Sequence, residues 1–310
     1  MTAYKELSHI LEHLGVEVRI NSREKCDLIH IHSVGPYARY WAKKSRSPLV
    51  ITAHTAPGEL KYLFKLGIIV EKASTYYLRN LYNMADVVIA PTNFTKQVLE
   101  NLKITKPIEV ISNGVNLEKF KFDTVKRHEF RERYNILPDE KVIYSVGVRS
   151  SRKGLDKFLA IAKKMQHYKF LWIGRSPWAI AKNSFSDSIL IKKAPKNFIK
   201  TGYVDDVVGA HCAGDVFLFP SPFETQGISA LEAAACSRPI IVENIPSFEW
   251  VGKSCLKAKT IDDYCAQIEE ALNHYKKYQE YSDNLAKQND VIRTGKAMIR
   301  LYENVLMTYK

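Results

Sequence analysis

The sequence lacks several features that define whole classes of protein. Its five cysteines are odd in number and scattered, and no Cys-x-x-Cys pair occurs. This pattern fits neither a disulfide framework nor a zinc site, and it predicts buried thiols in a reducing compartment. No apolar run approaches the ~20 residues that span a bilayer, and the first residues lack the apolar segment of a signal peptide. We therefore expect a cytoplasmic protein, or one that is peripheral on the inner face of a membrane.

The chain has an excess of positive charge, and this excess is not confined to one end of the sequence. The chain has 46 Lys and Arg against 33 Asp and Glu, a net charge of +13, which favours anionic partners such as phosphates or acidic lipid. Residues 1–140 hold 21 cations and 16 anions, and the remainder holds 25 and 17. This even distribution argues against a basic nucleic-acid arm, and no base-reading module appears. We expect no nucleic-acid partner.

Length and composition indicate two globular domains. The chain has 310 residues, of which 46% are hydrophobic and 25% charged, enough to bury two cores and to exclude disorder. Short β-branched runs alternate with helical stretches, the pattern of βαβ units and doubly wound α/β sheets. The first set of expected strands is Gly15–Ile20, Asp27–His32, Pro48–His54, Asp86–Thr92 and Ile108–Val115, with helices around Tyr4–Leu14, Pro36–Lys44, Val70–Met84 and Phe94–Leu102. The second set of strands is Val142–Val148, Phe170–Gly174, Ile189–Lys192, Asn197–Val204, Asp215–Ser221 and Pro239–Val242.

A charged stretch at 118–140 separates the two sets of strands. It predicts two Rossmann-like domains that face each other across a cleft, the first at residues 1–115 and the second at 116–295. The tail from Thr260 is helical throughout, and we expect two or three helices, with the last (296–310) packing back on the first domain.

The chain opens on a helix, whereas an open α/β domain normally begins with a strand and a tight glycine turn. We therefore expect the first domain to lack its opening strand. Either translation starts upstream of Met1 or part of the site has been lost.

One strand runs into a turn with two glutamates. The apolar strand Val216–Phe219 precedes the segment 220–235, in which a Pro/Ser turn and Gly227 lead into an Ala-rich helix. A helix N-terminus leaves backbone N–H groups unpaired and attracts anions, and ligands of such sheets bind at strand carboxyl ends. Glu224 and Glu232 cannot serve a phosphate, but they suit the hydroxyl groups of a sugar or ribose. The alternative is that Glu224 caps the helix and Glu232 is solvated.

A second turn carries three cations. The segment 147–154 follows a strand and places Arg149, Arg152 and Lys153 ahead of a helix. Arg and Lys there can neutralise and hold a diphosphate, although the Walker spacing is missing. The alternative is an ordinary solvated basic loop.

Taken together, these motifs closely resemble the retaining family 4 (group 1) glycosyltransferases of the GT-B fold. The family's Glu-x7-Glu signature appears as Glu224 and Glu232, and its basic glycine loop as 147–154. The strands that flank the nucleotide base and the strand end that carries a His also have counterparts. The matching segments, in chain order, are 50–54, 112–120, 147–154, 170–174, 201–204 and 224–232.

The resemblance implies transfer of a hexose from a nucleoside-diphosphate sugar, UDP-glucose being the first expectation, with retention and with neither metal nor other cofactor. Glu232 would hold the ribose hydroxyls and Glu224 those of the donor sugar. Lys153, with Arg149 or Arg152, would stabilise the departing diphosphate. The basic loop has one residue more than the family's usual form, so both arginines stay candidates. The other donor-binding residues implied are Gly147, Gly174, Tyr203, Val204, Gln226, Gly227 and Ile228.

The first domain is expected to contribute one histidine. The resemblance places His54 over the donor sugar, and the alternative is a satisfied histidine at a strand end. No Asp-x-Asp metal clamp is evident, because Asp205-Asp206 is expected to begin a helix. Cationic side chains would do the work of a metal.

The acceptor is expected to be a membrane lipid. In the stretch 60–82, Lys61, Lys65, Lys72 and Arg79 interleave with Tyr and Phe, and such a face suits an anionic headgroup layer. The alternative is a helix pair with its apolar side in the core and its lysines solvated. The segment 243–250 is similar to members that glucosylate diacylglycerol. Two alternatives remain. The acceptor could be soluble or a polysaccharide precursor, or the chain could be an inactive GT-B protein that binds a nucleotide sugar.

Overall fold

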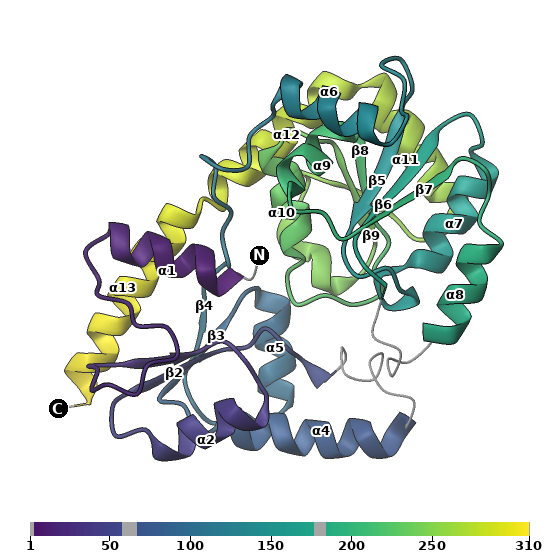
Figure 1. Ribbon diagram of the computed structural model, residues 1–310. Helices are drawn as coiled ribbons and strands as arrows, with labels where there is room; N and C mark the ends of the chain where they lie inside the picture. Colours follow the sequence, from purple (N-terminus) through teal and green to yellow (C-terminus); the bar gives the residue numbers. More distant parts are fainter. Residues whose placement is uncertain (1–2, 58–66, 177–183, 310) are drawn as a thin grey trace. The chain divides into compact units, whose positions relative to one another are not determined.

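The computed structural model describes residues 3–57, 67–176 and 184–309 (Figure 1). The chain divides into two compact units: unit 1 consists of residues 1–114 with 289–310, and unit 2 of residues 115–288. The second boundary lies before the expected one at 295, because α13 (Val291–Thr308) is one continuous helix whose cap residue is Asp290. In the described ranges, no helix combines the length and the apolar composition needed to cross a bilayer.

Unit 1 contains a four-stranded parallel sheet in the order β1-β2-β3-β4. The strands are β1 (Ile29–Ile31), β2 (Leu49–Thr52), β3 (Val87–Ala90) and β4 (Ile108–Val110). The helices are α1 (Ala3–His13), α2 (Pro36–Lys44), α4 (Gly67–Tyr82), α5 (Asn93–Asn101) and α13. Four of the five expected strands and all four expected helices are therefore confirmed.

The expectation of a strand at Gly15–Ile20 was wrong. Gly15 adopts a left-handed turn (φ 90°) directly after α1, and irregular backbone follows. Val16 and Val18 pack against the core beside α1, while Arg19 pairs with Glu17 on the outside. The alternation of apolar and polar residues is therefore real, but none of the described strands pairs with this segment.

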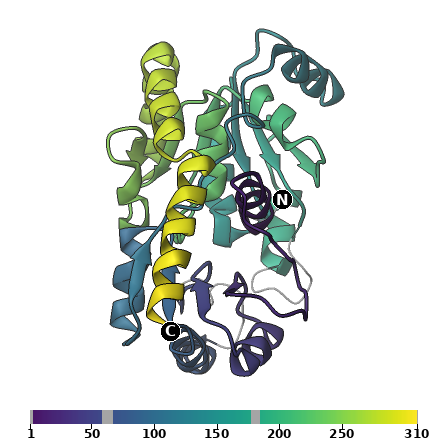
Figure 2. The same cartoon turned by 90° about the vertical axis from the view of Figure 1, so that its left-hand side faces the viewer.

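Helices cover both faces of this sheet, as the uniformly apolar strands require. On one face α2, α4 and α5 pack through side chains such as Ala42, Leu78 and Leu99. On the other face α1 and α13 pack on Val50 and Ile89. Figure 2 shows α13, in yellow, beside the purple α1. The last helix of the chain thus belongs to the same core as the first.

Unit 2 contains a six-stranded parallel sheet in the order β10-β9-β8-β5-β6-β7. The strands are β5 (Val142–Val146), β6 (Lys169–Ile173), β7 (Phe198–Gly202), β8 (Val216–Phe219), β9 (Ile240–Glu243) and β10 (Leu256–Ala258). The helices are α6 (Thr124–Arg133), η1 (Ser151–Lys153), α7 (Leu155–Lys164), α8 (Ser184–Lys192), α9 (Val207–Ala213), α10 (Ile228–Ala235), η2 (Pro246–Val251), α11 (Ile261–Asn273) and α12 (Tyr275–Gln288). Two parallel α/β sheets confirm the predicted fold class.

Two strand predictions in unit 2 need correction. The expected strand Ile189–Lys192 is the last part of the helix α8, since a short apolar run does not by itself distinguish a strand from a buried helical segment. Leu190 and Ile191 pack into the core, whereas Ile189 is partly exposed. The edge strand β10 was not expected, because its three residues are too short to stand out.

The prediction for the tail was correct. From Thr260 onward the chain forms three helices, α11, α12 and α13. A reciprocal capping box starts α11: the Thr260 side chain accepts from the backbone N–H of Asp263, whose carboxylate accepts from the N–H of Thr260.

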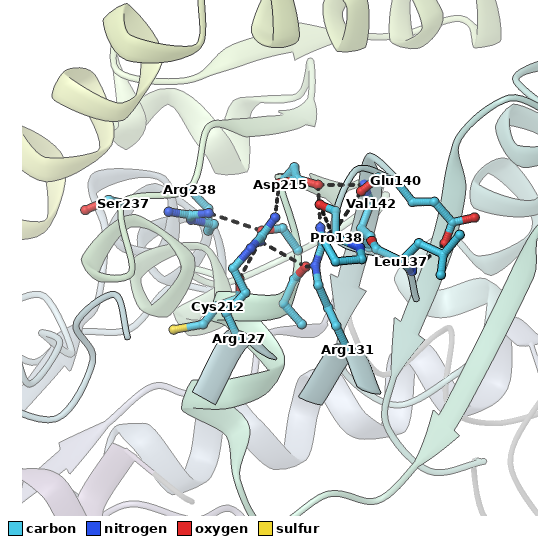
Figure 3. A network of polar contacts seen from close by, with 12 residues as sticks. Arg127, Arg131, Leu137, Pro138, Glu140, Val142, Cys212, Asp215, Ser237 and Arg238 are labelled. Carbon is cyan, nitrogen blue, oxygen red and sulfur yellow. Dashed lines mark hydrogen bonds and ion pairs between the residues drawn. The ribbon is translucent and has the colours of Figure 1, made fainter. Parts of the chain in front are cut away.

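An arginine–aspartate network holds the amino ends of β5 and β8 together (Figure 3). Asp215 accepts from Arg127 at 2.7 Å, from Arg131 at 2.8 Å and from the backbone N–H of Val142 at 2.8 Å. Arg127 also donates to the carbonyls of residues 212–214, which end α9 and need donors. These arginines therefore serve the fold, at the edge of the sheet opposite to the predicted site.

Candidate functional site

The predicted donor-binding residues of unit 2 gather at one edge of its sheet. All six strands are parallel, so their carboxyl ends share that edge. Gly147 follows β5, Gly174 follows β6, Tyr203 follows β7 and Glu224 follows β8. Segments far apart in the sequence thus contribute to one surface.

Three glycine segments bring the backbones at this edge into close contact. Gly147 N donates to Ile173 O at 2.9 Å, and Gly174 N donates to Gly202 O at 2.9 Å. A Cβ on Gly174, whose φ is 141°, would collide with the carbonyl of Gly147. Trp172 Nε1 donates to the same carbonyl at 3.0 Å. Gly174 is therefore needed for the close approach of β5 and β6.

The second part of the basic loop, Ser151–Lys153, forms the 3₁₀ turn η1, which is anchored from two sides. Gly154 ends it in the left-handed region (φ 82°), where a Cβ would strike the carbonyl of Pro220. The carboxylate of the buried Asp187 accepts from both the backbone N–H and the hydroxyl of Ser151. Burial raises the pKa of Asp187. Sequence reasoning missed Asp187, because the helix that carries it was not predicted: residues 189–192, just after it, were assigned to a strand.

Lys153 and Glu224 form a largely buried ion pair at this edge, after the central strands β5 and β8. Lys153 Nζ lies 2.5 Å from Glu224 Oε1, and the hydroxyl of Ser221 donates to the same oxygen at 2.7 Å. The two charged side chains are 16% and 8% exposed. Glu224 does not cap α10, whose N-cap is Gly227. The structure therefore brings together the two residues to which the sequence assigned phosphate and sugar recognition.

The two candidate arginines lie in different environments. Arg149 is buried, its Nη2 donates to Ser176 Oγ at 2.6 Å, and burial lowers its pKa. Arg152 belongs to η1, and its carbonyl accepts from Ser221 at 3.3 Å. Arg149 thus lies at the ends of β5 and β6, whereas Arg152 lies beside the turn that follows β8.

The amino terminus of α10 completes the edge. Gly227 adopts φ 85°, and a Cβ there would crowd the ring of Phe219. Gln226 is buried just before it, and Ile228 begins the helix. Unpaired backbone N–H groups and the helix dipole at such a terminus attract an anion.

The predicted ribose and base ligands are partly open to solvent. Glu232, on α10, is 18% exposed, and its Oε2 lies 3.5 Å from Nε2 of the buried His211. Tyr203, after β7, is 74% exposed, and the neighbouring Val204 is half-buried. An exposed aromatic ring at a strand end can stack on a base.

His54 belongs to a cluster of three partly buried histidines in unit 1. His32 Nδ1 and His54 Nε2 lie 3.1 Å apart, and the rings stack at 5.4 Å. His30 contacts Tyr302 at 2.6 Å and Thr52 at 2.7 Å. Sequence reasoning missed His30 and His32, although the pattern His-x-His at the end of β1, next to the strand that precedes His54, could have indicated them.

Burial makes these imidazoles weak bases. It lowers the pKa of His54 to about 4 and, with a contribution from the neighbouring His54, the pKa of His32 to about 3. Burial also lowers the pKa of His30 well below its usual value. At neutral pH this cluster therefore offers hydrogen bonds without charge.

The predicted basic and aromatic stretch is described only in part. Lys61 and Lys65 lie outside the described residues. Lys72, Arg79 and the 71% exposed Tyr76 line a hollow of about 520 Å³ together with Asn101, Leu102 and Lys103. The opposite side of α4 packs into the core. The helix therefore agrees both with a basic face for anionic headgroups and with an apolar side in the core of the domain.

No group of three or more His, Cys, Asp or Glu side chains within the described ranges is arranged to hold a metal ion.

Two family models match the chain in succession. Residues 2–119 match the model described as Glycosyltransferase Family 4, and residues 140–274 match the model described as Glycosyl transferases group 1. The two matches together include the ion pair, the basic loop and the histidine cluster.

The chain is similar over nearly its whole length to enzymes of glycolipid synthesis. It is 26% identical to the processive diacylglycerol alpha-glucosyltransferase of Acholeplasma laidlawii, over 98% of this chain and 93% of that protein. It is 24% identical to the alpha-galactosylglucosyldiacylglycerol synthase of Streptococcus pneumoniae, over 97% and 80% of the two chains.

The fold is shared with solved glycosyltransferase structures. HepE from Anabaena, solved in complex with UDP-glucose, superposes with a TM-score of 0.75 at 15% identity, covering 90% of this chain and 79% of that one. The likeness shows the fold, and the two family models identify the activity. The chain therefore belongs to the GT-B glycosyltransferases, with a Family 4 first half and a group 1 second half.

Proposed function

We propose that this glycosyltransferase moves a hexose from a nucleoside-diphosphate sugar, glucose from UDP-glucose in the first instance, to a membrane lipid. The transfer retains the anomeric configuration and needs no metal. The observation that carries the proposal is the Lys153–Glu224 ion pair beside the amino terminus of α10. The similarity to two diacylglycerol-glycolipid enzymes and the shared fold with a UDP-glucose complex support the choice of acceptor and donor.

The ion pair suits a donor that carries both a diphosphate and hydroxyl groups. On donor binding, Lys153 exchanges Glu224 for the diphosphate, and the freed carboxylate accepts from the sugar hydroxyls. When the sugar leaves, negative charge develops on the diphosphate, where Lys153, Arg149 or Arg152, and the N–H groups of α10 stabilise it. These cations do the work that a metal ion does in other transferases.

The remaining roles follow from the position and charge of each group. Glu232 holds the ribose hydroxyls, and Tyr203 stacks on the base. His54 offers a neutral imidazole to the reacting sugar, because its pKa of about 4 keeps it uncharged at pH 7. A neutral imidazole can both donate and accept a hydrogen bond.

The acceptor proposal rests on α4. Its exposed Lys72, Tyr76 and Arg79 lie on the face opposite to Leu78 and Leu81, which are buried. A surface with cations and an exposed aromatic ring suits an anionic headgroup layer. We place the enzyme at the cytoplasmic face of the membrane, as a peripheral protein.

The test is a transfer assay with UDP-, GDP- and ADP-hexoses in the presence of EDTA. Vesicles of phosphatidylglycerol or phosphatidylcholine, each containing dioleoylglycerol, supply the acceptor. Transfer from UDP-glucose to dioleoylglycerol, faster on the anionic vesicles, supports the whole proposal, and proton NMR of the product reads its anomeric configuration. A need for added Mg²⁺ contradicts the metal-free mechanism.

Two other outcomes redirect the proposal. A rate of sugar transfer or hydrolysis that does not change when vesicles are added indicates a soluble or polysaccharide-precursor acceptor. Nucleotide-sugar binding without turnover indicates an inactive binding protein.

A further inference from the structure

His211 is a fully buried polar residue beside the proposed ribose ligand. It lies on α9 and is 0% exposed. Its Nδ1 is 3.1 Å from the hydroxyl of Tyr144 on β5, and its Nε2 is 3.5 Å from Oε2 of Glu232 on α10. Nε2 has no hydrogen-bond partner among the described residues. A buried polar atom of this kind calls for an explanation.

The two neighbours of the ring indicate which nitrogen carries the proton. The carboxylate of Glu232 can only accept, so the nitrogen that faces it, Nε2, is the one that suits an N–H. Nδ1 then accepts from the hydroxyl of Tyr144. Nε2–H then points toward the carboxylate of Glu232.

Aromatic packing fixes the ring in this orientation. Phe120 and Tyr144 meet it edge-on, with interplanar angles of 78° and 79°, and Phe217 lies tilted against it at 6.0 Å. Such packing leaves the ring little freedom to turn. Glu232 is held less tightly, since it stays partly exposed at the edge where the donor is expected.

The distance of 3.5 Å is too long for a good hydrogen bond. A small rotation of the Glu232 side chain would shorten this distance, whereas the enclosed ring of His211 has no room to move. The His211 N–H therefore acts as a fixed hydrogen-bond donor that sets the orientation of the Glu232 carboxylate.

We propose that His211 is a positioning residue: held by Tyr144, it orients Glu232 to accept hydrogen bonds from the two ribose hydroxyls of the donor nucleotide. The inference rests on the proposed nucleotide-sugar site. Tyr144 and His211 are both fully buried, so both act through Glu232.

The experiment compares nucleotides with and without the hydroxyls in question. Calorimetry measures the dissociation constants of UDP, GDP and ADP, each beside its 2′,3′-dideoxy analogue, for the unaltered chain and for His211→Phe. We expect the unaltered chain to prefer the ribose form by about tenfold or more, as for a lost hydrogen bond to a charged group. His211→Phe loses most of this preference but binds the dideoxy form as before.

Three further variants separate positioning from space filling. In a Glu232→Gln background, His211→Phe has little further effect on the ribose preference. His211→Gln, whose amide N–H can replace Nε2–H, restores part of it. Tyr144→Phe keeps the ring and lowers the preference by a smaller factor, and this variant tests the inference if His211→Phe does not fold.

Two results overturn the inference, and they can be told apart. If His211→Phe retains the full ribose preference, His211 only fills space, and the donor site stands. If the unaltered chain binds no nucleoside diphosphate, or binds both forms equally, the assignment of Glu232 fails and this inference fails with it.

Discussion

In unit 1 the notable polar groups are three imidazoles, one within β1 and two just after β1 and β2, whereas the carboxyl edge of the sheet in unit 2 carries cations and carboxylates. Both sheets are wholly parallel and covered by helices on both faces. The histidines His30, His32 and His54 are neutral at pH 7, because burial lowers their pKa values. In unit 2, Lys153 and Glu224 keep opposite charges 2.5 Å apart.

The chemistry of each sheet therefore depends on the side chains at the ends of its strands. The charged edge of unit 2 can recognise an anionic donor, and the Lys153–Glu224 ion pair balances two of its charges. The histidine cluster of unit 1 offers hydrogen bonds without charge.

The largest effect is expected for Lys153→Ala. It removes the charge that we assign to the diphosphate and leaves the buried Glu224 without its cationic partner, so turnover is expected to fall by about 10²–10³-fold. Steady-state kinetics with the donor at saturation measures the change. Lys164→Ala, which removes an exposed lysine paired with Asp262, is the control and keeps normal turnover. An active Lys153→Ala enzyme contradicts the phosphate role.

The histidine cluster of unit 1 is expected to make the fold less stable in acid. The folded-state pKa values of His54 (about 4) and His32 (about 3) lie below the ordinary 6.5. The unfolded chain therefore binds more protons between these values, and the free energy of unfolding falls as the pH drops from 6.5 toward 4. Over the two pH units from 6.5 to 4.5, each of these histidines costs roughly 2–3 kcal/mol of stability.

Urea denaturation between pH 7 and pH 4.5 measures this loss. His32→Phe is expected to show a shallower dependence on pH than the unaltered chain, because one buried group no longer has to stay neutral. Equal slopes in the two proteins contradict the interpretation that these histidines stay neutral.

Glu232→Ala sharpens the role of the charged edge. Losing the proposed ribose contact is expected to weaken nucleotide binding by about tenfold or more, while turnover at saturating donor changes less, since the diphosphate separates the ribose of the donor from the bond that breaks. Calorimetry and kinetics read these quantities separately. A loss confined to turnover contradicts the assignment.

The smallest effect is expected on α4. Replacing Lys72 or Arg79 with alanine removes about 1 kcal/mol of attraction to an anionic vesicle, or about fivefold in affinity. Vesicle co-sedimentation at low salt measures it, and Lys296→Ala on α13 controls for net charge. If all three variants lose the same affinity, the attraction is a general effect of charge and α4 has no special part in it.

Much of the fold could be predicted because its elements carry local signals. The helix expected at Pro36–Lys44 matches α2 at both ends, since proline favours a first helical turn. The segment 189–192 was misassigned, because three apolar residues in a row carry no period. The segment 15–20 has the alternation of a strand, but pairing depends on a neighbour that local sequence does not reveal.

Residue type and spacing were sufficient to predict the alternation of strands and helices, the glycine and basic turns, and the pair of glutamates that resembles the GT-B signature. These are local features. The contact of Lys153 with Glu224, the anchoring of Ser151 by Asp187 and the position of His211 between Tyr144 and Glu232 became visible only in the folded chain. Strand order and side-chain packing bring such groups together, and neither can be read from the spacing of residues along the chain.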